Sequence, residues 1–174
     1  DLYNNPTYMM VVCPDEWIET LEPWVEWKTK VGIYVDVCPT SETGSTYNAI
    51  KSFVHNKFAE GQSVGETPTY LVLVGDVDKI PNENGSSSHA VTDLYYASVD
   101  GDYFPDMYYS RMSVANAQEL SNIIEKSMHY EQVLTDDVSY LGEALLIAGV
   151  DSSWNPQVGQ PAINYAHENH FTAE

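Results

Sequence analysis

The chain has 174 residues, 43% of them hydrophobic, which is enough material for one domain with a packed core. It carries 26 Asp and Glu residues against 7 Lys and Arg, giving a formal net charge of −19 at pH 7. Such a surface repels nucleic-acid backbones and attracts metal cations or basic peptides, although solubility alone also accounts for it. No segment offers the roughly 18 consecutive apolar residues of a membrane-spanning helix.

The sequence opens at Asp1 without a methionine and without a basic, apolar signal peptide. This opening favours a cytosolic or an already processed protein. Aromatic residues make up 12% of the chain, and this content argues against a disordered acidic segment.

The first half alternates short apolar runs with amphipathic segments. The runs YMMVVC, IYVDVC and YLVLV predict strands at 8–13, 33–38 and 70–74. One helix is expected from Pro23 to a cap at Gly32, and a second from Ser45 and Thr46 to Gly61. This β-α-β-α-β order with apolar strands predicts an α/β fold with a doubly wound, mostly parallel sheet flanked by helices.

The second half continues with less regular spacing. Two short strands, 95–99 and 107–112, are expected to form a small β-hairpin around an acidic turn. Asn116 and Glu119 form a capping box that begins a helix running to Val133. A last strand is expected over 144–150 and a final helix over 161–171.

The acidic turn places Asp100, Asp102 and Asp106 within seven residues. Three carboxylates so close repel one another unless a cation neutralises them, and Ca²⁺ accepts six to eight oxygen ligands, backbone carbonyls included. Phe104 offers only its backbone carbonyl, and Asp76 at the end of a predicted strand could complete the shell. The alternative is a solvated Asp-Gly turn.

Cys13 and Cys38 each end a predicted strand and each precede a proline. If the two strands are parallel neighbours in register, the side chains lie at disulfide distance, as an exported protein permits. Two buried free thiols are the alternative.

Four segments carry a resemblance to a known family: DLYNNP, YLVLVGDVDKIP, TDLYYASVDGDYFPDMYYSRM and IAGVDSSWNPQVGQP. They are similar to the first subdomain of gingipain-type cysteine protease catalytic domains, most of all in the lysine-specific branch. The resemblance implies a caspase-like fold in which residues 1–174 form the amino-terminal subdomain. The cysteine nucleophile and the catalytic histidine of that family belong to the second subdomain.

The resemblance also implies roles for individual residues. Asp151 would hold the catalytic histidine, although a turn-forming Asp is the plainer interpretation. Trp154 would line the substrate cleft, or else anchor its loop. The same resemblance assigns structural calcium to Asp76, Asp100, Asp102, Phe104 and Asp106.

The sequence therefore predicts half of an enzyme. We expect the amino-terminal part of a secreted or cell-surface bacterial cysteine endopeptidase that cleaves after lysine and is inactive alone. Its second catalytic subdomain would lie on a separate chain, as in a nicked enzyme, or be missing, as in a truncated product. Its other partners would be Lys-containing peptides, with no nucleic acid and no membrane span. The alternative is a calcium-stabilised binding or adhesin module, which needs the acidic turn but not Asp151.

Overall fold

The computed structural model describes residues 7–85, 90–132 and 137–171. The chain divides into two compact units, with the boundary after Gln132, and each is described by itself. Among the described residues, no helix combines the length and the apolar character needed to cross a bilayer.

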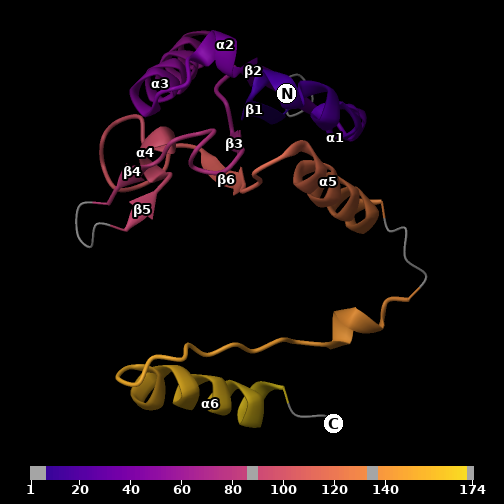
Figure 1. The fold of residues 1–174 in the computed structure, drawn as a ribbon, viewed down its shortest axis with the longest axis vertical. Helices are drawn as coiled ribbons and strands as arrows, with labels where there is room; N and C mark the ends of the chain where they lie inside the picture. The colour runs from indigo at the N-terminus through magenta and orange to yellow at the C-terminus, as the bar shows by residue number, and fades with distance from the viewer. Residues whose placement is uncertain (1–6, 86–89, 133–136, 172–174) are drawn as a thin grey trace. The chain divides into compact units, whose positions relative to one another are not determined.

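The first unit is built on a four-stranded parallel sheet in the order β2-β1-β3-β6 (Figure 1). Its strands are β1 (Thr7–Cys13), β2 (Ile33–Pro39), β3 (Tyr70–Val74) and β6 (Tyr108–Met112). The strands predicted at 8–13, 33–38 and 70–74 are confirmed to within one residue. Their continuous apolar character reflects burial on both faces of the sheet.

Helices cover both faces of this sheet. Figure 1 shows α1 (Ile18–Lys30) and α5 (Ala117–Glu131) on one side of the strands, and α3 (Tyr47–Val64) and α4 (Leu94–Ala97) on the other. Alternate strand residues enter two separate cores: Val11 packs toward α1 and α5, whereas Val12 packs toward α3 and α4. Burying each such side chain contributes about 1.5–3 kcal/mol.

The predicted N-caps of α3 and α5 form, although Glu119 returns its hydrogen bond to the Ala115 N–H and not to that of Asn116. The Thr46 hydroxyl accepts a hydrogen bond from the Ala49 N–H at 3.3 Å. Asn116 accepts one from the Glu119 N–H at 3.0 Å, and Glu119 accepts one from the Ala115 N–H at 2.8 Å. These bonds satisfy amide groups that a helix start otherwise leaves unpaired.

Two helix boundaries differ from the prediction. Helix α1 begins at Ile18 and contains Pro23, because burial of Leu21 and Trp24 outweighs the one backbone hydrogen bond that proline removes. Helix α3 continues past Gly61 to Val64. Gly61 is buried inside the helix, and Gly65, at φ 77°, provides the left-handed cap.

The expected hairpin around the acidic turn is wrong. Residues 94–97 form α4, whose Tyr96 and Ala97 are fully buried, and β6 pairs in parallel with β3. An antiparallel pair does exist, but it joins β4 (Glu83–Asn84) to β5 (Val91–Thr92) ahead of α4. Burial of Tyr96 against the α3 side overrides the strand propensity of its aromatic neighbours.

The second unit contains two short helical turns, η2 (Ser139–Gly142) and η3 (Asn155–Gly159), and α6 (Gln160–His170). The strand predicted over 144–150 is wrong, since these residues have no regular structure. A strand needs a hydrogen-bonded neighbour, and none lies among the described residues of this unit. Leu145 and Ile147 are 86% and 75% exposed, so the unit has little core of its own.

Strand β2 forms one edge of the sheet and carries a charge at its centre. The Asp36 carboxylate accepts hydrogen bonds from the Tyr8 hydroxyl at 2.7 Å and from Lys57 Nζ of α3 at 3.2 Å. Burial, together with Asp36, raises the pKa of Tyr8 far above its usual value. This edge is therefore tied to its neighbouring strand and helix by a half-buried polar cluster.

Arg111, the only arginine of the chain, fastens the carboxyl end of the sheet. Its Nε and Nη2 donate to the two Asp93 oxygens at 2.8 and 2.7 Å. Its Nη1 donates to the carbonyls of Gly75 and Ile80 at 2.7 and 2.8 Å. One guanidinium thus joins β6, the turn after β3 and the start of α4.

We predict that Arg111→Met lowers the free energy of unfolding by about 3 kcal/mol, because it leaves Asp93 and two carbonyls without their donor in a largely buried site. Urea denaturation followed by circular dichroism measures the change. Lys79→Met, which removes the partly exposed Lys79–Glu16 pair, is the control and should change stability by less than about 1 kcal/mol. Equal effects of both variants would contradict the prediction.

Candidate functional site

The carboxyl ends of β1 and β3 mark the natural location for chemistry in this fold. The chain leaves β1 toward β2 on one side and returns through α3 to β3 on the other, so the strand order reverses between them. Open α/β sheets bind ligands at such a reversal. Asp15 and Glu16 follow β1 at this edge, and Asp76 follows β3.

The two acids after β1 are already engaged by neighbouring groups. Asp15 accepts hydrogen bonds from the Ser41 hydroxyl and, at 2.8 Å each, from the Thr40 hydroxyl and the Ser41 N–H, and these bonds hold its pKa below the usual value. Glu16 binds Lys79 Nζ at 2.8 Å, which also lowers the pKa of Glu16. Both carboxylates therefore act as ionised braces of the sheet edge.

Asp76 sits in a tight turn after β3. Its Oδ1 accepts hydrogen bonds from the Val77 N–H at 2.8 Å and from the Ser113 hydroxyl at 3.2 Å. The preceding Gly75 has φ 127°, and a Cβ there would lie 2.8 Å from Cβ of Lys79. Only glycine allows this turn to close, so the position of Asp76 is fixed by the backbone.

The structure separates Asp76 from the acidic turn. Strands β3 and β6 are parallel, with Tyr70 opposite Tyr108 and Val74 opposite Met112. Asp76 follows the carboxyl end of β3, whereas Asp106 precedes the amino end of β6. At about 3.3 Å per residue the two lie at opposite ends of the strands. The prediction that Asp76 shares a calcium shell with the turn is wrong.

The acidic turn is organised by its own backbone. Asp106 accepts a hydrogen bond from the Val99 N–H at 2.7 Å, Asp100 from the Asp102 N–H at 3.1 Å, and Asp102 from the Phe104 N–H at 2.6 Å. Within the described ranges, no three metal-binding side chains come together. Asp100, Asp102, Phe104 and Asp106 supply hard oxygen donors in one loop. The predicted set of five, which includes Asp76, does not form one site.

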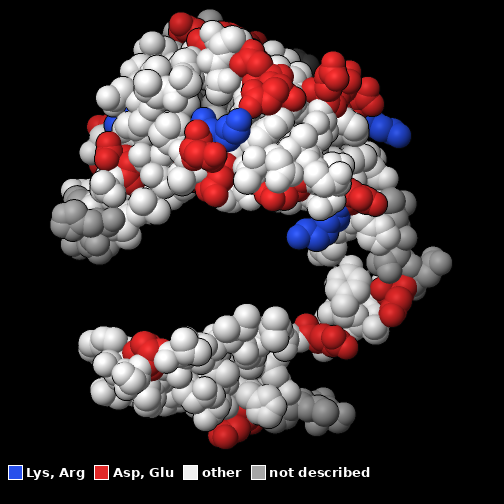
Figure 2. All heavy atoms as spheres, in the orientation of Figure 1, with Lys and Arg blue, Asp and Glu red and all other residues white. Residues whose placement is uncertain are grey.

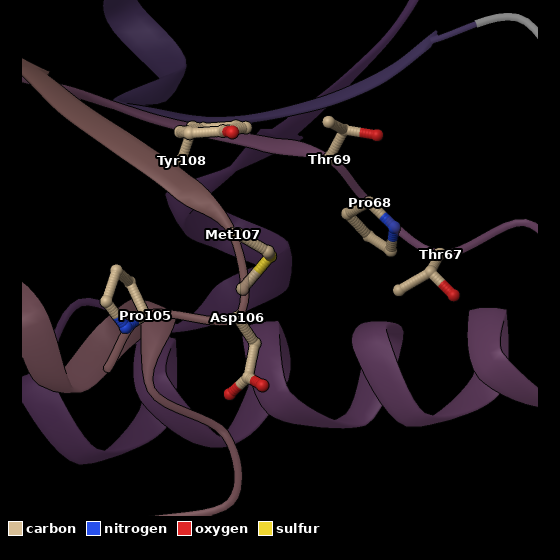
Figure 3. Close-up of a pocket in the computed structure, with 7 residues that line it drawn as sticks. All are labelled: Thr67, Pro68, Thr69, Pro105, Asp106, Met107 and Tyr108. Carbon is tan, nitrogen blue, oxygen red and sulfur yellow. The ribbon is translucent and has the colours of Figure 1, made fainter. Parts of the chain in front are cut away.

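A pocket of about 430 Å³ lies beside this turn, at the amino ends of β3 and β6 (Figure 3). Figure 3 shows the Asp106 carboxylate turned away from Tyr108. The lining residues are Thr67, Pro68, Thr69, Pro105, Asp106, Met107 and Tyr108. Because parallel sheets place ligand chemistry at their carboxyl ends, this pocket is remote from the expected catalytic edge.

The predicted disulfide is wrong. Strands β1 and β2 pair so that Val12 lies opposite Cys38 and Cys13 lies opposite Pro39. The two cysteines are one residue out of register, and their side chains enter opposite cores. Both thiols are free and buried, as the alternative interpretation expected.

Neither thiol is suited to nucleophilic attack. Burial raises the pKa of Cys13 and of Cys38 to about 12, so both are neutral thiols at physiological pH. His55 contacts the Tyr95 carbonyl through Nε2 at 3.1 Å, and burial lowers its pKa. Among the described residues no histidine bonds a cysteine, so this part of the chain shows no Cys-His pair.

Asp151 anchors the loop between residues 150 and 155. Its Oδ1 accepts hydrogen bonds from the N–H groups of Ser153, Trp154 and Asn155 at 3.0, 2.5 and 3.3 Å. These bonds lower the pKa of Asp151, although the side chain is exposed. The residue is ionised at neutral pH, and its contribution to the turn is lost only as pH falls through this lowered pKa.

Trp154 follows in the same loop with 71% of its surface exposed. Its carbonyl accepts hydrogen bonds from the N–H groups of Gln157 and Val158 at 3.2 and 2.9 Å, which close the turn that precedes α6. The indole itself is not buried within the second unit. The backbone of Trp154 therefore shapes the loop, while its ring stays exposed within the second unit.

Comparisons with known proteins place this parallel α/β domain among the cysteine peptidases with a caspase-like fold. Residues 2–173 match the model of peptidase family C25, and the chain belongs to that family. It is 48% identical over its whole length to Lys-gingipain W83 of Porphyromonas gingivalis, of which it covers 10%. It is 30% identical over 92% of its length to Gingipain R2 of the same organism, of which it covers 21%.

Solved structures agree with this assignment. A structure described as a protease superimposes over 99% of this chain with a TM-score of 0.87 and 48% identity, and the chain covers 38% of it. The complex of the Porphyromonas gingivalis RgpB pro- and mature domains superimposes over 95% of this chain with a TM-score of 0.76 and 27% identity, and the match covers 40% of the RgpB chain. The chain thus spans a minor part of each of these relatives.

Sequence reasoning missed the pairing of Arg111 with Asp93. A usable signal existed, since a lone arginine inside a short strand of a strongly acidic chain needs an acidic partner. The partner itself was not predictable, because Asp93 precedes α4, which was expected to be a strand.

We predict that Cys13 and Cys38 resist a thiol reagent such as DTNB in the native protein at pH 8 and react promptly in guanidinium. The reason is burial combined with a pKa of about 12 for each thiol. The denatured, unreduced protein should titrate two thiols, and prior reduction is the control that should leave this number unchanged. Fewer than two titratable thiols before reduction would contradict this prediction and support a disulfide.

Proposed function

We propose that residues 1–174 form the amino-terminal part of the catalytic unit of a secreted cysteine endopeptidase that cleaves after lysine. Membership of peptidase family C25 supports the reaction class. The nucleophile and the histidine would come from a further part of the enzyme, because Cys13 and Cys38 are buried neutral thiols. Alone, these residues would be inactive.

Asp151 is the residue of this chain that we propose to enter the active site. One carboxylate oxygen holds the loop, while Oδ2 makes no hydrogen bond among the described residues. An ionised carboxylate held by three amides is suited to receive an imidazole N–H, to fix its tautomer and to stabilise the imidazolium beside a thiolate. This geometry is the observation that carries the proposal.

The preference for lysine rests on similarity. The chain is 48% identical to a relative named Lys-gingipain and 30% identical to one named Gingipain R2. The exposed indole of Trp154, three residues after Asp151, has a flat apolar face on which the stem of a lysine or the peptide backbone can pack. Trp154 would then bind substrate, and Asp151 would serve the chemistry.

We predict that Asp151→Asn in the complete enzyme lowers kcat by between about 100-fold and 10⁴-fold. The Asn oxygen still accepts the hydrogen bonds from the loop N–H groups, but the side-chain amide no longer holds the histidine in the correct tautomer. Turnover of a lysyl amide substrate and thermal unfolding are measured together. Thermal stability should change little.

Asp137→Asn is the matched control. Asp137 lies in the same unit and also accepts a backbone hydrogen bond, from the Ser139 N–H at 2.9 Å, with a lowered pKa. Its replacement should leave kcat within about twofold. Equal kcat in both variants would overturn the role of Asp151.

We further propose that the acidic turn binds structural calcium through Asp100, Asp102, Asp106 and the Phe104 carbonyl. The density of hard oxygen donors in a seven-residue loop supports this. The Asp106 N–H already donates to the Ala97 carbonyl at 2.9 Å, and the Ser98 hydroxyl donates to the Asp102 carbonyl at 2.6 Å. The ion would join this hydrogen-bonded turn by drawing the remaining carboxylate oxygens inward.

Calcium at about 100 times its dissociation constant should stabilise the protein by about 2.7 kcal/mol, because the ion binds only the folded turn. Thermal unfolding with and without EGTA measures this. Asp102→Asn keeps the acceptor for the Phe104 N–H but removes the charge, and it should abolish most of the shift. Asp78→Asn changes an acidic residue outside the turn and should keep the calcium-dependent shift. Loss of the shift in both variants, or in neither, would contradict the site.

A further inference from the structure

The six lysines of the chain differ in how the fold holds them. On the face drawn in Figure 2, basic groups are few and acidic groups are spread over the surface. Four of the six lysines are half-buried and only two, Lys30 and Lys126, are exposed. For a chain that we propose to be part of a lysine-cleaving enzyme, this distribution decides where the chain itself can be cut.

Lys28 and Lys79 are held by both an acid and an indole. Lys28 Nζ lies 2.7 Å from Glu131 and 5.4 Å from the Trp24 ring. Lys79 Nζ lies 2.8 Å from Glu16 and 5.3 Å from the Trp17 ring. A protease needs the lysine side chain free to enter its specificity pocket, so each of these contacts must break first.

The peptide bond after Lys79 is also protected by the burial of the next residue. Ile80 is fully buried, and its carbonyl accepts a hydrogen bond from Arg111 Nη1 at 2.8 Å. An endopeptidase binds several residues on each side of the scissile bond in an extended conformation. The chain beyond Lys79 cannot extend without losing this burial and the Arg111 contact.

Lys51 and Lys57 lie inside α3. Lys51 Nζ is 5.7 Å from the Tyr95 ring, and Lys57 Nζ is 3.2 Å from Asp36. The residue after Lys57 is Phe58, which is buried in the core between α3 and the sheet. Cleavage at Lys51 would require unwinding the first turns of this 18-residue helix, and cleavage at Lys57 would require unwinding its middle.

The two exposed lysines differ in their backbone. The Lys126 side chain has no hydrogen bond or ion pair among the described residues, but the residue lies within α5, between the buried Ile124 and the helix end at Glu131. Lys30 is the last residue of α1, and its Nζ lies 6.0 Å from the Trp27 ring. Access to the Lys30 bond therefore needs far less unwinding.

The backbone around Lys30 is suited to capture in an extended form. Val31 is 50% exposed, and Gly32, at φ 93°, turns the chain out of the helix. Two hydrogen bonds hold the turn, from the Val31 N–H to the Trp27 carbonyl at 3.1 Å and from the Gly32 N–H to the Thr29 carbonyl at 3.0 Å. Helix ends open at low free-energy cost, and a cap glycine has no side chain to obstruct a protease cleft.

We propose that the Lys30–Val31 peptide bond is the modification site of this chain, the first bond that a lysine-specific endopeptidase hydrolyses in the folded protein. Water adds across the bond, so that Lys30 gains a carboxylate and Val31 a free amine. The biological form of this proposal, cleavage by the chain's own enzyme, rests on the proposed function. The accessibility itself rests on the geometry alone.

The cut should leave the fold assembled. Strand β1 pairs with β2 on one side and with β3 on the other, and α1 buries Leu21 and Trp24 against the sheet. Residues 1–30 would therefore stay bound to the remainder as a non-covalent fragment. A nicked protein would migrate as one species in native conditions and as two in denaturant.

The test is limited digestion of the folded protein by a purified lysine-specific serine endopeptidase, with intact mass spectrometry at short times. The first products should end at Lys30 and begin at Val31, and they should co-elute on native gel filtration. Lys30→Arg, which keeps the charge, should lower the initial rate of cleavage at least tenfold. Lys126→Arg is the matched control and should leave that rate within twofold.

A first cut elsewhere, an unchanged rate for Lys30→Arg, or a folded protein that resists while the denatured one is digested would each overturn the proposal. The complete enzyme, incubated alone, then tests the biological form. If the added protease cuts at Lys30 but the active enzyme cleaves only arginyl substrates, the lysine preference fails while the site stands. If the added protease cuts elsewhere and the enzyme still turns over lysyl substrates, the site fails alone.

Discussion

The register of the parallel sheet is the constraint from which most of this structure follows. Because β1 pairs with β2 along its length and with β3 from Met9 to Val12, successive residues of β1 enter two different cores, one under α1 and α5 and one under α3 and α4. The same register sends Cys13 and Cys38 to opposite faces. The parallel direction of β3 and β6 places Asp76 and Asp106 at opposite ends of the sheet. Hydrogen-bond pairing thus decides which side chains can cooperate.

The sequence predicts those features whose causes are local. The apolar runs at 8–13 and 70–74 identify strands buried on both faces, and Thr46 and Asn116 identify helix starts through short-range capping bonds. Features that depend on distant partners were not predictable. The aromatic segment at 95–99 has strand propensity, yet Tyr96 gains more by burial in a helical turn against α3.

The candidate site divides in the same way. That Asp151 forms a turn follows from its residue type and its neighbours, and the structure shows the three hydrogen bonds from backbone N–H groups that hold that turn. The strand expected just before it depends on a neighbouring strand that sequence patterns cannot supply. Leu145 and Ile147 are consequently left exposed within the second unit.

The polar cluster on β2 governs how this domain behaves at high concentration. An edge strand with unpaired amides is a template on which a second copy can add its own strand. Asp36, held by Tyr8 and Lys57, puts a charge on the inward-facing side of that edge. An added strand would have to bury this charge against apolar neighbours. The domain is thereby guarded on this side against open-ended growth into fibrils.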